Sequence, residues 1–162
     1  MPAEIERKFL LDRLPEWLDD HESKEIEQGY LVVGENDEVR LRRAGDARRL
    51  TVKIGHGRTR DETEIELDPA QFESLWPLTR DRRIAKTRFL VPLDGDLTAE
   101  VDVYAGDLEG FRVVEVEFPS EEASDAFAPP AWFGEDVTGQ REYSNQRLAI
   151  EGGRPGSPAG ER

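Results

Sequence analysis

One pattern recurs along most of the chain: short segments in which charged side chains alternate with apolar ones. The first segment, "EIERKFLL", places Glu4, Glu6 and Lys8 at every second position, with Ile5 and Phe9 between them. A β-strand points successive side chains to opposite faces, so such a segment has one charged face and one largely apolar face. Taken alone, one such segment is explained by a half-solvated strand.

Seven segments show this pattern, each tends to carry one sign of charge, and both signs recur along the chain. The charged positions are Glu4, Glu6 and Lys8; Arg40 and Arg42; Lys53; Glu62, Glu64 and Glu66; Lys86 and Arg88; Glu100 and Asp102; and Glu115 and Glu117. A β-sandwich with its charges facing water gives no reason for the signs to separate by strand. We therefore predict a closed antiparallel β-barrel, a tunnel of about eight strands with a charged interior and an apolar outer surface.

Amphipathic helices are expected to cover the outside of this barrel, which makes the fold class α+β, mainly β. In "DPAQFESLWPL", Asp68 is a predicted helix cap and Pro69 the first helical residue. Phe72, Leu75 and Trp76 follow at the spacing of one helical face. Residues 1–150 are predicted to form one domain, and the Gly/Pro-rich segment 151–162 a disordered tail.

Composition excludes several classes of function. The chain has no cysteine, so disulfides, thiolate zinc sites and a cysteine nucleophile are excluded. The net charge of −14 argues against nonspecific binding to nucleic acid, which depends on positive patches. No apolar run is long enough to span a bilayer, so we expect no membrane partner and a cytoplasmic location.

A charged interior indicates a ligand, because buried charges are costly unless a partner compensates them. Clustered carboxylates raise one another's pKa values unless a cation lies between them, and hard divalent ions such as Mg²⁺ or Mn²⁺ prefer such oxygen ligands. Clustered Arg and Lys side chains favour a polyanion, and guanidinium groups match phosphate oxygens. Acidic and basic groups in one cavity predict a site for a metal-bound polyphosphate.

These residues resemble a known family, the CYTH superfamily or triphosphate tunnel metalloenzymes. "EIERK" matches the Glu-x-Glu-x-Lys signature of the family. Further matches follow in the family's order from residue 4 to about 149: "QGYL", "VRLRR", "LTVK", "ETEIE", "KTRF", "EVDVYAG", "VVEVEF" and "VT…YSN…LA". The likeness is greatest to small bacterial members that hydrolyse inorganic triphosphate, to which "FESLWP", "KTRF" and "PPAWFGEDVT" are particularly similar.

The resemblance implies a role for each charged position. Metal binding is implied for Glu4, Glu6, Glu115 and Glu117. Phosphate binding is implied for Lys8, Arg40, Arg42, Lys53, Lys86 and Arg88. Lys86 is similar to a family lysine that influences substrate positioning and activity. A second metal or a water molecule is implied for Glu62, Glu64, Glu100 and Asp102, and the sequence does not separate these two roles. We assign Glu62, Glu64 and Lys86 to catalysis, and Glu100 and Asp102 to the metal.

The implied activity is hydrolysis of inorganic triphosphate to pyrophosphate and phosphate, dependent on Mg²⁺ or Mn²⁺. Its partner would be a small-molecule triphosphate. The sequence leaves open a thiamine triphosphatase, an adenylate cyclase and a non-catalytic binder of polyphosphate or nucleotide. It also leaves open whether the protein is a monomer or a homodimer. One departure from the family is Glu142, which stands where a base usually precedes the tyrosine; the nearest base is Arg141.

Overall fold

The computed structural model describes residues 5–35, 37–55 and 61–151, and within these residues eight strands form one antiparallel sheet. The strands are β1 (Ile5–Leu10), β2 (Ser23–Val33), β3 (Glu38–Ala44), β4 (Ala47–Ile54), β5 (Asp61–Glu66), β6 (Arg83–Pro92), β7 (Thr98–Tyr104) and β8 (Arg112–Phe118). Their order across the sheet is β1-β8-β7-β6-β2-β3-β4-β5. The prediction of a mainly β fold with about eight antiparallel strands is confirmed.

Short helices connect and flank these strands. The α-helices are α1 (Pro69–Leu75), α2 (Glu121–Ala126) and α3 (Asn145–Glu151). The 3-10 helices are η1 (Leu18–Asp20), η2 (Trp76–Thr79), η3 (Asp94–Asp96), η4 (Gly106–Leu108) and η5 (Arg141–Tyr143). None of the helices in the described ranges is long and apolar enough to cross a membrane. The predicted tail falls outside the described residues, except for Glu151, the last residue of α3.

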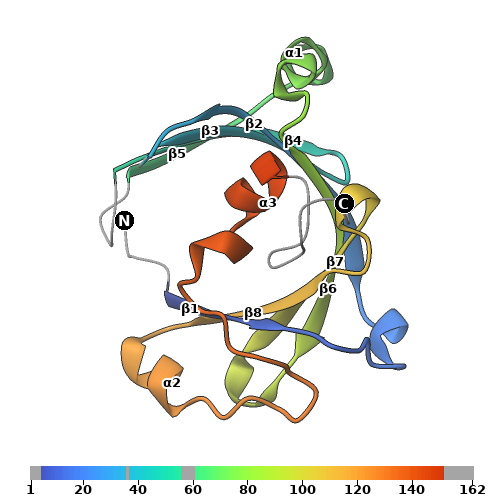
Figure 1. The fold of residues 1–162 in the computed structure, drawn as a ribbon, viewed down its shortest axis with the longest axis vertical. Coiled ribbons are helices and arrows are strands. Elements are labelled where there is room, and N and C mark those ends of the chain that lie inside the picture. Colours follow the sequence, from blue (N-terminus) through green and yellow to red (C-terminus); the bar gives the residue numbers. More distant parts are fainter. Residues whose placement is uncertain (1–4, 36, 56–60, 152–162) are drawn as a thin grey trace.

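Helix α1 begins where the sequence predicts. The Asp68 carboxylate accepts a hydrogen bond from the backbone N–H of Gln71 at 2.7 Å, and the Gln71 side chain accepts one from the backbone N–H of Asp68 at 2.9 Å. This reciprocal capping satisfies two N–H groups at the helix start. Phe72 is fully buried, and α1 lies on the convex side of the curved sheet, as expected for an outer helix (Figure 1).

Apolar side chains gather on both faces of the sheet. On the convex face, Phe9, Val101 and Val114 are buried in a cluster that the segment after α2 covers with Phe127 and Phe133. On the concave face, Leu148 and Ala149 of α3 pack against Tyr30, Tyr104 and Phe111. Helix α3 therefore lies inside the curve of the sheet, and Figure 1 shows it there. The interior is part apolar, which the prediction of a charged interior did not include.

The prediction of a closed barrel is wrong. The sheet order ends at β1 and β5, and no ladder joins these two strands within the described residues. Alternation of side chains determines which face each residue occupies, but closure depends on twist, tilt and stagger, which that period does not encode. Strand β5 is also acidic at four of its six positions, and charged side chains are typical of edge strands that stay unpaired. The sheet is strongly curved but open.

Gly29 allows η2 to pack directly on β2. A Cβ atom at position 29 would lie 2.5 Å from Oγ1 of Thr79 and 2.6 Å from its Cβ. Thr79 is fully buried, and its hydroxyl donates to the Trp76 carbonyl and accepts from Nε of Arg83. Any larger residue at position 29 must push η2 away from the sheet.

We expect Gly29→Ala to lower the free energy of unfolding by about 1–3 kcal/mol, because overpacking at a rigid contact forces the backbone to shift. Gly34→Ala is the matched control, since the nearest atom to its new Cβ is 3.7 Å away, an ordinary contact. The control should change stability by less than about 0.5 kcal/mol. Urea denaturation of both variants measures the difference, and equal values would contradict the close packing of η2.

Candidate active site

A cavity of about 920 Å³ lies against the concave face of the sheet. Ten of the predicted site residues line it. The acidic ones are Glu6, Glu62, Glu100, Glu115 and Glu117, and the basic ones are Lys8, Arg40, Arg42, Lys53 and Arg88. They come from seven of the eight strands, which explains why no single segment of the sequence contains the site. Glu4 falls outside the described residues.

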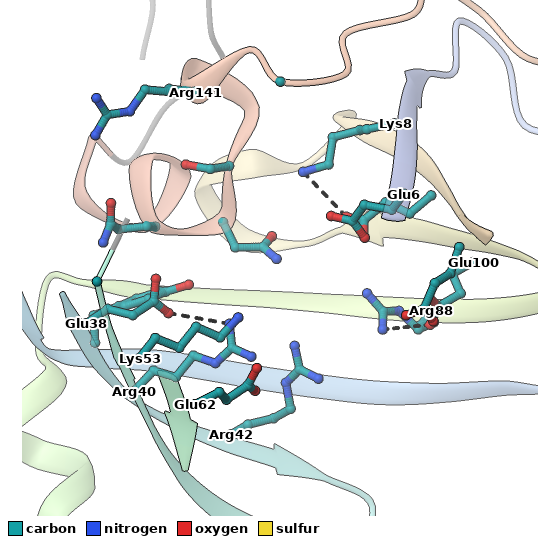
Figure 2. A pocket seen from close by; sticks show the side chains of 18 of the residues that line it. Glu6, Lys8, Glu38, Arg40, Arg42, Lys53, Glu62, Arg88, Glu100 and Arg141 are labelled. Carbon is teal, nitrogen blue, oxygen red and sulfur yellow. Dashed lines mark hydrogen bonds and ion pairs between the residues drawn. The ribbon is translucent and has the colours of Figure 1, made fainter. Parts of the chain in front are cut away.

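Strand register gathers four carboxylates on one wall of the cavity and three cations on the facing wall. Four carboxylates from three adjacent strands form one wall, here called the acidic wall: Glu6 of β1, Glu115 and Glu117 of β8, and Glu100 of β7. Arg40 and Arg42 of β3 and Lys53 of β4 form the other, here called the basic wall. Figure 2 shows Arg40, Arg42 and Lys53 across the cavity from Glu6 and Lys8.

The carboxylates of the acidic wall are close neighbours in the sheet. Glu6 pairs with Glu117 across β1 and β8, and Glu115 pairs with Glu100 across β8 and β7. Such cross-strand pairs place Cβ atoms roughly 5 Å apart. Burial raises the pKa of Glu100, and although Arg88 opposes this, the charges of Glu115, Asp102 and Glu117 add to the rise. This wall therefore concentrates negative charge.

Two cations partly compensate the acidic wall. Lys8 Nζ lies 3.4 Å from the Glu115 carboxylate, and Arg88 Nη1 lies 2.8 Å from the Glu100 carboxylate. No three carboxylates or histidines of the described residues are already gathered as a formed metal site. The donor set nevertheless fits a hard divalent cation, because neighbouring carboxylate oxygens are the ligands that Mg²⁺ and Mn²⁺ prefer.

The structure places Lys86 and Asp102 behind the cavity rather than in it. Neither side chain is exposed, and Lys86 Nζ donates to the Asp102 carboxylate at 2.8 Å. Arg88 donates two further hydrogen bonds to the same carboxylate, from Nε at 2.8 Å and from Nη2 at 3.0 Å. Burial opposes ionisation of Asp102, but the charge of Lys86 and the hydrogen bonds from Arg88 lower its pKa to about 2.

This network gives the three residues a clear geometric role. Asp102 has two cationic partners that occupy both of its oxygens, so in this structure it faces Lys86 and Arg88 and no open space. Arg88, in contrast, lines the cavity while Asp102 holds its Nε side.

Glu64 also does not line the cavity. Its carboxylate accepts a hydrogen bond from the Thr51 hydroxyl at 3.3 Å and lies 3.2 Å from Arg49 Nη1.

The basic wall carries cations at close quarters. Burial lowers the pKa of Arg42, and the nearby charges of Arg40 and Arg88 lower it further. Arg40 Nη1 lies 3.5 Å from the Glu38 carboxylate, but its buried Nε has no hydrogen-bond partner in the described part of the chain. An anion in the cavity would reduce the repulsion and supply acceptors for these donors.

Three charged residues of the cavity were missed in the sequence: Glu35, Glu38 and Arg141. Glu38 is 6% exposed and lines the basic wall beside Arg40. It lies two positions before Arg40 on the same strand, so the alternation that identified Arg40 also points to Glu38. Arg141 lines the cavity as well, and Figure 2 shows it on the same segment as the C-terminal helix. Arg141 therefore supplies a basic group to the cavity, although Glu142 stands directly before Tyr143.

Two side-chain hydrogen bonds attach the C-terminal segment to the sheet, one from β1 and one from β7. Lys8 Nζ donates to the backbone carbonyl of Tyr143 at 3.0 Å. The Tyr104 hydroxyl donates to Asn145 Oδ1 at 2.6 Å, and Asn145 itself lines the cavity. Burial raises the pKa of Tyr104, which keeps this hydroxyl a donor. These bonds hold η5 and α3 as one side of the site.

Comparison with known proteins identifies a family and relatives that span most of the chain. The model of the CYTH domain matches residues 2–128. An inorganic triphosphatase of Nitrosomonas europaea is 45% identical over 149 residues, covering 91% of this chain and 97% of that protein. An inorganic triphosphatase of Acetivibrio thermocellus is 35% identical over 155 residues, covering 91% of this chain and 94% of that protein.

A solved structure shares the fold as well. A crystal structure of an inorganic triphosphatase superposes with a TM-score of 0.75 at 43% sequence identity, covering 93% of this chain and 96% of that one. The family model spans more than half of the chain, and both relatives align along nearly their whole length. The chain belongs to the CYTH domain family.

Proposed function

We propose that this protein hydrolyses inorganic triphosphate to pyrophosphate and phosphate and that it requires a divalent cation, Mg²⁺ or Mn²⁺. The observation that carries the proposal is the pair of facing walls: four carboxylates on one side of a single cavity and three cations on the other. The names of the two relatives and of the solved neighbour support the same activity.

The basic wall would hold the phosphate groups. Arg40, Arg42 and Lys53 present donors to the cavity, and Lys8, Arg88 and Arg141 add further donors around it. Guanidinium groups bind phosphate oxygens in a fixed fork, so this arrangement both attracts and orients a linear polyanion. Orientation of the terminal phosphorus toward an attacking water is a large part of phosphoryl-transfer catalysis.

The acidic wall would hold the cation, through Glu6, Glu115 and Glu117 together with Glu4. When bound, the cation would neutralise charge on the phosphate oxygens and lower the pKa of water. Glu100 is a further candidate ligand, since it lines the same wall. Asp102 and Lys86 are better explained as residues that position Arg88, because both are fully buried in their mutual ion pair.

Glu62 is the better candidate to orient the attacking water. It is half-buried, lines the cavity, and lies directly across from Lys53 in the β4–β5 ladder. Glu64 lies outside the cavity and is engaged by Thr51 and Arg49. A carboxylate within reach of the terminal phosphate can position a water molecule or accept its proton.

The lining favours an inorganic substrate over a nucleotide. Sites for organic ligands usually present apolar and aromatic side chains to the organic part. Among the described residues that line this cavity, Tyr30 is the one aromatic side chain, and it is only 1% exposed. No surface in the described cavity wall is suited to stacking an adenine or a thiamine ring.

A substrate panel tests this proposal directly. We expect Mg²⁺- or Mn²⁺-dependent release of phosphate from inorganic triphosphate with a kcat/KM at least about a hundredfold above those for ATP, thiamine triphosphate and pyrophosphate. Chelation of the metal should abolish turnover. A preference for an organic triphosphate would contradict the assigned substrate, and binding of triphosphate without any turnover would contradict the assignment as an enzyme.

Glu6→Gln should separate metal binding from folding. The change keeps the shape of the side chain but removes a charged ligand, so we expect metal-dependent turnover to fall roughly a hundredfold or more. Isothermal titration with Mn²⁺ should show weakened binding, while urea denaturation shows a folded protein. Glu25→Gln, at an exposed position of β2 outside the cavity, is the control. Wild-type turnover and Mn²⁺ affinity in Glu6→Gln would disprove this role.

Arg40→Gln tests the basic wall. The loss of one preorganised cation at the phosphates should lower kcat/KM for inorganic triphosphate by roughly a hundredfold. Arg43 lies on the same strand but faces outward, where its guanidinium covers the rings of Phe72 and Trp76. Arg43→Gln should therefore keep kcat/KM within about threefold of the wild type. Steady-state kinetics of both variants measures kcat/KM for inorganic triphosphate. An equal loss of kcat/KM in the two variants would contradict the assignment of the basic wall as the substrate site.

A further inference from the structure

Gln28 is a fully buried polar side chain that connects two residues of the cavity. It lies on β2, directly across from Arg42 in the β2–β3 ladder. Its Oε1 accepts a hydrogen bond from Arg42 Nε at 2.8 Å, and its Nε2 donates to the Tyr30 hydroxyl at 2.7 Å. Gln28 does not line the cavity, whereas Arg42 and Tyr30 both do.

The chemistry of the partners determines how this amide is oriented. Guanidinium nitrogens can only donate, so the amide oxygen must face Arg42. The amide nitrogen then faces Tyr30, whose hydroxyl oxygen accepts. The bond to Gln28 is made by Nε of Arg42, which leaves the N–H groups of Nη1 and Nη2 as further donors of the guanidinium. One buried residue therefore sets the plane of the guanidinium.

Arg88 and Arg42 are held by hydrogen-bond partners of different charge. Arg88 is held by two carboxylates, Asp102 at 2.8 Å and Glu100 at 2.8 Å, which offset its charge. Arg42 is held by a neutral amide at 2.8 Å, which orients it without offsetting its charge. A neutral acceptor therefore leaves Arg42 with its full positive charge for an anion. A carboxylate at position 28 would orient Arg42 equally well but would reduce that attraction.

Tyr30 is the second residue that Gln28 orients. Its hydroxyl oxygen receives the Gln28 amide hydrogen, so its own hydrogen is free to point elsewhere. Burial and the neighbouring charge of Glu38 raise the pKa of Tyr30 to about 12, so the hydroxyl remains protonated. Arg42 and Tyr30 are thus two donors on neighbouring strands that both hydrogen-bond the Gln28 amide, and the Tyr30 hydroxyl has a second hydrogen-bond partner in Arg40.

We propose that Gln28 is a positioning residue that aims Arg42 and Tyr30 at one phosphate group of the substrate while leaving the charge of Arg42 uncompensated. The inference rests on the proposed function for the identity of the substrate. The inference that Gln28 supports binding of a phosphate polyanion does not depend on the proposed hydrolysis. The role of Gln28 and the proposed function can therefore be tested separately.

Two variants at position 28 separate orientation from charge. Gln28→Met removes both hydrogen bonds and keeps a similar shape. Gln28→Glu keeps an acceptor for Arg42 but adds a negative charge. A buried hydrogen bond to a charged group contributes enough to change affinity by about tenfold to a hundredfold. We expect both variants to raise the Kd for inorganic triphosphate by at least about tenfold, with the larger rise in Gln28→Glu.

The binding is measured by isothermal titration of the full-length protein with inorganic triphosphate in the presence of a chelator, so that the metal has no part in it. Steady-state kinetics with Mg²⁺ follow. In Gln28→Met we expect kcat/KM to fall about as much as the affinity, and urea denaturation identifies any variant that is not folded. Gln28→Glu can hydrogen-bond Arg42 as before, so it keeps the test decisive if Gln28→Met does not fold.

A double-mutant cycle distinguishes positioning from a general structural role. In an Arg42→Met background, Gln28→Met should have less than about a threefold effect on the Kd, since the residue through which it acts is gone. The same loss with and without Arg42 would overturn the proposal, and so would a Kd within twofold of the wild type in Gln28→Glu. If the wild type binds triphosphate with this dependence on Gln28 but does not hydrolyse it, the proposed function fails and the role of Gln28 stands.

Discussion

The electrostatic cost of placing many charges around one cavity governs this structure. Within the described residues, eleven charged side chains from the strands of a single sheet line a cavity of about 920 Å³. Charges of one sign gathered on one wall repel each other, and charges that lack water need partners. Four carboxylates lie on one wall and three cations on the facing wall, and ion pairs such as Lys8–Glu115 and Arg40–Glu38 offset part of the charge on each. The cavity between the walls is complementary to a cation bound to a polyanion.

Cations around the cavity are held by partners of two kinds. Lys8 and Arg88 belong to ion pairs with Glu115 and Glu100 on the acidic wall, so their charge is shared with the groups proposed to bind the metal. Arg42 is held by the neutral amide of Gln28 and keeps its charge. The first kind of support reduces repulsion where a metal would sit, and the second preserves attraction where phosphate would sit. One sheet thereby provides two different electrostatic environments on different strands around the same cavity.

Much of this arrangement could be predicted from the period of two alone. The alternation in "VRLRR" places Arg40 and Arg42 on one face and Leu41 on the other, and in the structure the arginines line the cavity while Leu41 is fully buried. Closure of the barrel could not be predicted, because the period gives the face of each residue and not the pairing of the first and last strands. The C-terminal helix also fills part of the interior, where Leu148 is packed among apolar side chains.

The roles of Asp102 and Gln28 could not be predicted from the pattern of charges in the sequence. Asp102 has the same sequence pattern as Glu100, yet its register beside Arg88 places it in a buried ion pair, and Gln28 carries no charge for a charge pattern to reveal.

We propose that the two walls act together, one on a metal ion and the other on the phosphates attached to it. The most direct measurement is a crystal structure with Mn²⁺ and a slowly hydrolysed analogue of inorganic triphosphate, with anomalous scattering used to locate the metal. We expect one anomalous peak or more at the carboxylates of Glu6, Glu115 and Glu117, with phosphate density against Arg40, Arg42 and Lys53. Metal and phosphate bound on the same wall, or phosphate density outside the cavity, would contradict it.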